Sequence, residues 1–350
     1  MSDELFVLGL SLAISLLLAW GFKTLPSERW QMLAAIPRSK TPDGGWQGEN
    51  LTFYGLLNAN AYVLAVMIFI VLMGASAASP VAIAAITAAL LGVCIPASKT
   101  VARIVEKKKH TFTVGGASFV GVLIAPWIIA ATNLALTPWM AAPVEIIPFL
   151  AALSTAYAFG EGIGRLACIS FGCCYGRPLS DCPPLLRRCF RNLCFVFSGR
   201  TKKIAYADGW EGRQVLPIQA ATAIVYCASG IAGVYLYLNG FYAATFLETL
   251  LITQLWRSFS EILRADYRGG RRISAYQVMA VAAAGYALLI AGFSPPVSSP
   301  PPEVLRGLAY LWHPAVILAL QALWAAVFLY TGRSSVTGSA LSFHVLRDRI

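Results

Sequence analysis

Long apolar runs dominate the chain and are separated by short polar segments. A helix needs about 20 mostly apolar residues to cross the hydrocarbon core of a bilayer, and the pattern contains stretches of about that length throughout. They lie at about 5–22, 51–73, 79–95, 113–131, 143–164, 216–237, 241–263, 274–293 and 307–330. We therefore predict an all-α integral membrane protein with about nine transmembrane helices, of which the third is short and the fifth contains charges.

The composition supports this prediction. Hydrophobic residues make up 58% of the chain and charged residues only 12%, whereas a soluble domain carries about 25% charged residues. The segment Met1–Glu4 is acidic and leads directly into the first apolar run. A secretory signal would begin with basic residues, so we expect the first run to be a retained helix.

One polar segment is too long for a simple turn. Residues 177–215 interrupt the apolar pattern, and a polar segment of that length is expected to fold as a small cap on the membrane surface.

Positive charge is predicted to lie on one side of the membrane. The chain has 27 Lys and Arg residues against 16 Asp and Glu residues. With nine alternating spans, 24 of the 27 basic residues fall on one face, in the loops 23–50, 96–112, 165–215 and 264–273 and in the C-terminal tail, while Arg165 and Arg257 lie near helix ends and Arg306 near the other face. Positively charged loops stay in the cytoplasm, so the pattern predicts a multi-pass protein of the cell inner membrane with its basic face cytoplasmic. The alternative is that the basic face binds anionic headgroups from outside; neither reading involves nucleic acid.

Ionisable residues within the predicted spans are candidates for chemistry, because they are costly in hydrocarbon. Glu161 and Arg165 are spaced i, i+4, and Arg257, Glu261 and Arg264 follow one helical stripe. Local ion pairs that hold the bundle together would explain both groups. The alternative is a polar cavity for an anionic headgroup, because two guanidinium groups can bind a phosphate bidentately. The other ionisable residues within the predicted spans are Glu145 and Glu248.

The densest segment is GRLACISFGCCYGR at 164–177, which follows the fifth predicted span. Its glycines permit close packing and an irregular exit from the helix. Irregular backbone at membrane depth is tolerated only where it is buried in protein or lines a cavity. The segment is therefore a candidate site.

This segment resembles the signature of the prolipoprotein diacylglyceryl transferase family, and four other stretches resemble family motifs in the same order over about 51–293. The matching residues are Gly164, Arg165, Gly172 and Gly176 in the signature; Arg257, Glu261, Arg264, Asp266 and Gln277 in the stretch 257–277; Tyr54 and Gly55 in LTFYGLL; Gly115 and Gly116 in TVGGASFVG; and Pro217 and Gln219 in LPIQ.

The chain also departs from the family pattern. Val114 and Leu216 stand where the family has His, Cys168 and Phe171 where its signature has Asn, and Cys173 where it has Glu. The resemblance implies a membrane core over 51–293 that carries the cap, preceded by an extra helix and basic loop over 1–50 and followed by an additional helix and basic tail over 294–350. The resemblance implies an active face directed away from the cytoplasm, whereas the charge pattern predicts the opposite.

The resemblance implies an enzyme that moves a diacylglyceryl group from a phosphatidylglycerol-like phospholipid donor to a nucleophilic acceptor, without a cofactor. The family's acceptor is the lipobox cysteine of a lipoprotein; a cytoplasmic-side metabolite or lipid is the alternative here. The catalytic candidates are Arg165, Arg257, Glu261 and Cys173. The substrate-binding candidates are Tyr54, Gly115, Gly116, Gly164, Gly176, Gln219 and Arg264.

Two other classes of protein remain possible from the residues. A lipid or anion transporter could use the same polar cavity. A thiol or metal protein could use the cysteines, six of which lie between Cys168 and Cys194. On an oxidising face these would form disulfides, and on a cytoplasmic face free thiols or a metal site. Their spacing matches no recognised zinc pattern, so we predict no metal.

Overall fold

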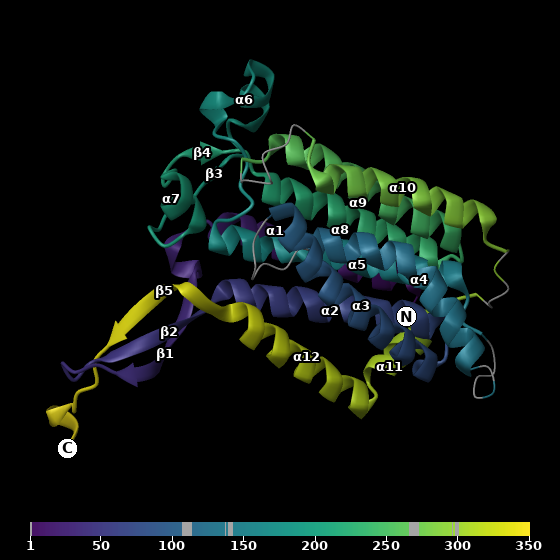
Figure 1. Cartoon of the computed structure of the whole chain (residues 1–350), viewed down its shortest axis with the longest axis horizontal. Coiled ribbons are helices and arrows are strands. Elements are labelled where there is room, and N and C mark those ends of the chain that lie inside the picture. The colour runs from purple at the N-terminus through teal and green to yellow at the C-terminus, as the bar shows by residue number, and fades with distance from the viewer. Residues whose placement is uncertain are drawn as a thin grey trace.

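The computed structural model describes residues 2–106, 114–136, 138, 143–265, 273–295, 297 and 301–350. The chain forms a bundle of long helices that run roughly along one direction, with two smaller structures projecting from one end (Figure 1). Within the described residues, eight helices are long and apolar enough to cross a membrane. The prediction of an all-α membrane protein is therefore confirmed.

The eight helices match eight of the predicted spans. They are α1 (Asp3–Thr24), α2 (Phe53–Ala75), α3 (Pro80–Glu106), α4 (Val114–Leu136), α5 (Ile146–Phe171), α8 (Ile218–Leu238), α10 (Ala275–Phe293) and α12 (Pro314–Gly332). The span predicted at 241–263 is also a helix, α9 (Tyr242–Leu263), packed between α8 and α10. It is less apolar than the eight because it carries Glu248, Arg257 and Glu261.

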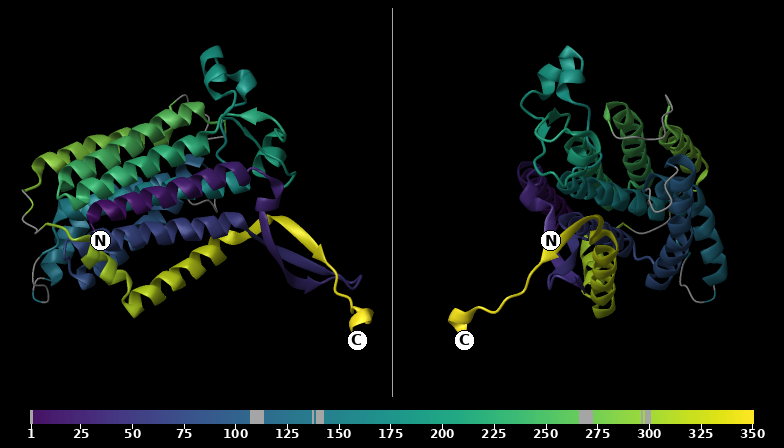
Figure 2. Two further views of the ribbon diagram at one scale, coloured as in Figure 1. Left: turned by 180° about the vertical axis from the view of Figure 1, so that it is seen from behind. Right: turned by 60° about the vertical axis from the view of Figure 1, so that its left-hand side comes forward.

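Helix α5 lies at the centre of the bundle and packs against α2, α8 and α9. In its most apolar stretch 72% of the residues are buried, against 6% for the peripheral α12. Small residues allow this close packing, as is usual between helices in a membrane. Gly162 faces Cys227 of α8, and Gly233 of α8 faces Thr155 of α5. Helix α1 lies along α8 and α5 on the outside of this core (Figure 2).

Two predicted spans have different bounds in the structure. The stretch 307–330 is not one helix but two, α11 (Val304–Leu311) and α12. The break falls at Trp312 and His313, and Pro314 occupies the first turn of α12, where its missing N–H donor leaves no intrahelical hydrogen bond unmade. His313 caps the new helix, and its Nδ1 accepts a hydrogen bond from the Ala315 amide at 3.3 Å. The third span is not short, because α3 continues through Pro96 to Glu106.

A three-stranded antiparallel sheet replaces two of the predicted basic loops. It consists of β1 (Met32–Lys40), β2 (Trp46–Thr52) and β5 (Arg333–Leu341), with β2 in the middle. Asn50 pairs with both Ala35 of β1 and Ser334 of β5. The sheet extends away from the bundle (Figures 1 and 2) and joins the added segments at the two ends of the chain. A short 3-10 turn, Arg347–Arg349, follows it.

The predicted cap over 177–215 is present at the same end of the bundle (Figure 1). It contains the short helices α6 (Pro184–Phe190) and α7 (Lys203–Asp208), the 3-10 turn Leu179–Asp181, and the paired strands β3 (Phe195–Val196) and β4 (Gln214–Val215). The cap is fastened to the segment after α1. Gln31 Nε2 donates to the Thr201 carbonyl at 2.7 Å, and Lys202 Nζ donates to the Leu25 carbonyl at 3.2 Å.

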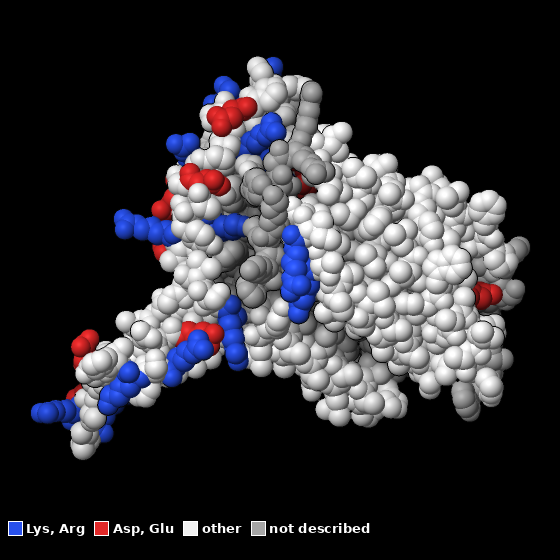
Figure 3. All heavy atoms as spheres, in the orientation of Figure 1, with Lys and Arg blue, Asp and Glu red and all other residues white. Residues whose placement is uncertain are grey.

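Charged side chains gather at this end of the molecule. In Figure 3 the Lys and Arg residues lie over the cap, the sheet and the adjoining end of the helical bundle, whereas the surface of the helices beyond them is almost free of charge. At the opposite end, Arg306 is paired with Glu303 at 3.1 Å. The basic residues at 107–109 and 268–272 lie outside the described residues, as does Asp266. The structure therefore agrees with a one-sided distribution of charge.

Candidate functional site

A pocket opens between α5, α8 and α9 at the end of the bundle that carries the cap. It is narrow, with a cavity volume of about 10 Å³, roughly the room that one water molecule needs. Three of the residues predicted from sequence as catalytic and two predicted to bind substrate line it together. The lining residues are Arg165, Cys174, Ile218, Gln219, Thr222, Tyr226, Arg257, Ser260, Glu261 and Arg264.

Arg165 lies on the last turns of α5 and forms the predicted ion pair with Glu161, one helical turn earlier. Both side chains are nearly buried, with 15% and 9% of their surfaces exposed. The Arg165 Nε is buried and has no hydrogen-bond partner in the described part of the chain. An unsatisfied buried donor costs about 1–3 kcal/mol, so this N–H group would be stabilised by a ligand that accepts a hydrogen bond.

Arg257 on α9 is held by aromatic side chains. Its Nη1 donates a hydrogen bond to the Tyr157 hydroxyl at 3.3 Å. The guanidinium carbon lies 5.8 Å from the ring centre of Tyr276, within the range of a cation–π interaction. Gly115 of α4 packs directly on the guanidinium, where a side chain would overlap its Nη2 atom. The predicted site residues Arg257 and Gly115 are therefore in contact.

The ion pair at the end of α9 does not join the residues that are spaced i, i+4. Glu261 pairs with Arg264, at 3.8 Å, rather than with Arg257. Both partners are more than nine-tenths buried at the side chain. Arg257 interacts electrostatically with Tyr157, Glu161 and Tyr226.

Three guanidinium groups meet at the pocket. Electrostatic repulsion acts between Arg165 and Arg264 and between Arg165 and Arg257. Among the described residues, the carboxylates of Glu161 and Glu261 pair with Arg165 and Arg264. Charges removed from water need a partner. A bound anion would therefore stabilise this arrangement.

Gln219 supplies a polar group from the start of α8. Its Nε2 donates to the Cys173 carbonyl at 2.9 Å, which holds the chain after α5 against α8. Its Oε1 is buried without a hydrogen-bond partner in the described residues. The amide oxygen is thus free to accept a hydrogen bond from a ligand hydroxyl.

Other predicted site residues lie around the pocket rather than in it. The Tyr54 ring packs on Phe171, with ring centres 5.4 Å apart. Gly164 faces α2, where an added Cβ would lie 3.9 Å from Asn58 Oδ1. Gly176 forms an isolated antiparallel bridge with Arg264 and leaves no room for a side chain beside Leu216. Gly116 is buried next to Gly115.

Several pocket residues had no signal in the sequence. Tyr226, Thr222 and Ser260 line the pocket, and Tyr157 orients Arg257. They are neutral residues within apolar helices, so neither charge nor spacing distinguishes them from packing residues. They can be identified as pocket residues only once the packing of α5, α8 and α9 is known.

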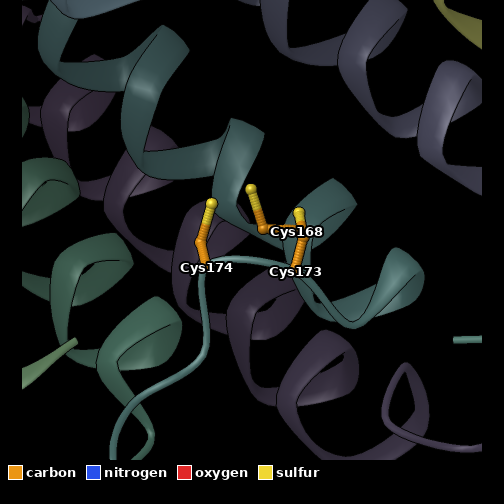
Figure 4. Close-up of side chains that lie close together, drawn as sticks. All are labelled: Cys168, Cys173 and Cys174. Carbon is orange, nitrogen blue, oxygen red and sulfur yellow. The ribbon is translucent and has the colours of Figure 1, made fainter. Parts of the chain in front are cut away.

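The cysteines divide into two groups. The Sγ atoms of Cys168, Cys173 and Cys174 all lie within 4.8 Å of one another at the end of α5 (Figure 4), whereas Cys182, Cys189 and Cys194 belong to the cap and form no such group. All eight cysteines are free thiols. Hydrogen bonding to Cys168 and Cys174, together with burial, raises the pKa of the Cys173 thiol well above its ordinary value. Cys173 is not among the residues that line the pocket.

Comparison with known proteins adds no relative to this description. No family model, no curated protein and no solved structure matches the chain.

Proposed function

We propose that the protein is a phospholipid-dependent membrane transferase that moves a diacylglyceryl group from a phosphatidylglycerol-like donor to a nucleophilic acceptor. The observation that carries the proposal is the pocket lined by Arg165, Arg257 and Arg264. A phosphodiester headgroup is anionic and would accept a hydrogen bond from the buried Arg165 Nε, which lacks a partner in the described part of the chain. The family motifs in the sequence supply the reaction class.

The arginines would act on the phosphate. The acceptor attacks the glyceryl carbon that bears the phosphate ester, the carbon–oxygen bond breaks, and its electron pair passes to the departing glycerol phosphate. Guanidinium groups stabilise this charge most where water is excluded, because the local dielectric is low. Arg165 and Arg257 are the residues assigned to this role. A base accepts the proton that the acceptor nucleophile loses.

Glu261 is a positioning residue in this proposal. Its carboxylate pairs with Arg264, and both are buried, so Glu261 fixes the direction of that guanidinium. Gln219 would bind a hydroxyl of the donor headgroup through Oε1. Cys173, predicted from the sequence as catalytic, would act on the pocket only through its backbone carbonyl, which accepts from Gln219.

The acceptor differs from the lipobox cysteine in this proposal. Val114 stands in the sequence where the family has His, directly before Gly115, which packs on Arg257. The pocket opens toward the charged end of the molecule, which the charge bias predicts to be cytoplasmic. A small metabolite or a lipid on that side is therefore the proposed acceptor.

The test is donor turnover by the purified protein in nanodiscs that contain phosphatidylglycerol, followed by mass spectrometry of lipids and glycerol phosphate. An extract of small metabolites and lipids supplies acceptors. Arg165→Ala and Arg257→Ala should each abolish release, and Lys at either position should restore little, because an ammonium cannot form a bidentate pair. Arg306→Ala is the matched control, because Arg306 lies at the opposite end of the bundle, paired with Glu303.

Full activity in Arg165→Ala or Arg257→Ala would end the phosphate-clamp proposal. Binding of phosphatidylglycerol without loss of the lipid, combined with movement of the lipid between leaflets, would favour a transporter instead. Comparison of the lipids of cells with and without the gene would identify the acceptor, since its diacylglyceryl product should disappear with the gene.

A further inference from the structure

Three thiols converge where α5 ends. Cys168 lies in the last turns of the helix, and Cys173 and Cys174 lie just beyond it (Figure 4). Gly172 ends the helix in the left-handed conformation, with φ of 70°, and the Cys173 amide donates to the Cys168 carbonyl at 3.0 Å. This reversal places all three Sγ atoms within 4.8 Å of one another.

The backbone at Cys174 adopts a strained, left-handed conformation next to the other two thiols. Its φ is 57°, and it is one of two non-glycine residues with positive φ in the described part of the chain. The left-handed conformation costs a residue with a Cβ roughly 1–2 kcal/mol, and such strain persists where the surroundings hold it in place. The surroundings here are the Gln219 hydrogen bond to the Cys173 carbonyl and the Ala265 amide, which donates to the Tyr175 carbonyl at 3.1 Å.

From this geometry we propose that Cys168, Cys173 and Cys174 bind one thiophilic metal ion, of the class of Zn²⁺ or Cu⁺. A thiolate binds zinc at about 2.3 Å, so three sulfur atoms around one ion lie about 4 Å apart. The three Sγ atoms lie within 4.8 Å of one another, so each pair would have to approach by less than about one ångström to hold the ion. Thiolates select soft ions such as Cu⁺ and Zn²⁺ over Mg²⁺ or Ca²⁺.

The surroundings also fit a charged metal–thiolate group. The thiols lose their protons to the solvent when the ion binds, which leaves the three-thiolate site with net negative charge for either ion. Arg165 interacts electrostatically with Cys168 and Cys174 and would offset that charge. Cys174 also lines the pocket, so a Zn²⁺ ion with three protein ligands could take its fourth ligand from that side. This site does not depend on lipid transfer.

The experiment is an anaerobic titration of the full-length protein in detergent with Zn²⁺ and, separately, Cu⁺, each buffered by a competing chelator. Bound metal per chain is measured by elemental mass spectrometry. We expect one ion per chain. Cys168→Ser, Cys173→Ser and Cys174→Ser should each weaken binding more than about tenfold, since even changes outside the ligand set alter metal affinity by 10–100-fold. Cys189→Ser, in the exposed part of the cap, is the control and should bind like the wild type.

A second measurement requires no substitution. Alkylation of the wild-type protein followed by peptide mass spectrometry should show that metal protects Cys168, Cys173 and Cys174 and leaves Cys189 reactive. Retained affinity in all three Ser variants, equal loss in Cys189→Ser, or equal alkylation of the three thiols with and without metal would overturn the proposal. A disulfide between any two of them in protein purified without reductant, with no metal bound, would overturn it as well.

Discussion

Lys202 offers a quantitative test of how the cap is attached to the bundle. Its side chain is fully buried, and Nζ donates to the carbonyls of Leu25 and Ser170 at 3.2 and 2.6 Å. It thereby joins the end of α1 to the end of α5. Burial lowers the pKa of Lys202 from 10.5 to about 8, although the charge of Glu28 acts in the opposite direction.

The pKa difference sets both the sign and the size of the expected effect. A lysine in the unfolded chain keeps its proton up to pH 10.5, whereas Lys202 in the folded chain releases it near pH 8. Between these values the unfolded state binds more protons, so stability rises with pH. Each pKa unit corresponds to about 1.4 kcal/mol. The free energy of unfolding should therefore gain about 3 kcal/mol from Lys202 across this window.

The measurement is denaturant unfolding in detergent at a series of pH values from 7 to 10.5, followed by tryptophan fluorescence. Trp210 reports on the cap, because its ring lies 5.8 Å from that of Tyr175. Lys202→Met has no charge to titrate and should lose the rise relative to wild type. Lys203→Met, at the neighbouring and less buried lysine, should keep it. Parallel pH profiles for the wild type and Lys202→Met would refute the reasoning.

Three further predictions follow from contacts already described. Gly115→Ala should displace the Arg257 guanidinium and reduce donor turnover at least about tenfold, which corresponds to roughly 1.4 kcal/mol of transition-state stabilisation. Gly92→Ala is the control and should have no effect, because nothing lies within 4 Å of its added Cβ. Gly55→Ala should overlap the backbone at the end of α12 and lower the thermal stability by about 1–3 kcal/mol, the usual cost of overpacking; calorimetry in detergent measures this against the same Gly92 control. Cys189 is exposed in the cap, so a membrane-impermeant maleimide should label it in lysed but not in intact cells if the charged face is cytoplasmic, and labelling of intact cells would place that face outside.

The long apolar runs were sufficient to predict the helices, because a bilayer sets the length and composition of each span independently of its neighbours. The sheet was not predictable in the same way. Strand β1 contains Pro37, which argues against a strand in a sequence and is tolerated because β1 lies at the edge of the sheet. Strand β2 is the central strand because β5, almost 300 residues later, pairs with its second edge. No local sequence pattern around β2 indicates so distant a partner.

The same division holds for the candidate site. The Glu161–Arg165 ion pair, one of the two interpretations of the i, i+4 spacing, is present in the structure. The partner of Arg257 did not follow from spacing, because Tyr157 belongs to a different helix. Of the six cysteines between 168 and 194, the structure brings three together. The reversal at Gly172 decides which three, and that is a property of backbone conformation rather than of cysteine spacing.

The sheet has a consequence for how the protein is made. Strand β2 pairs with β1 through a short connection, but its other edge stays open until the ribosome has synthesised β5. Throughout insertion of the intervening helices, the β1–β2 hairpin is an exposed edge that other chains can pair with. Completion of the sheet brings Thr52 Oγ1 to the Gly332 carbonyl at 2.9 Å, so a segment translated after the intervening helices closes a structure begun before them. A nascent chain that stalls before β5 would leave that edge open for a quality-control protease or for aggregation.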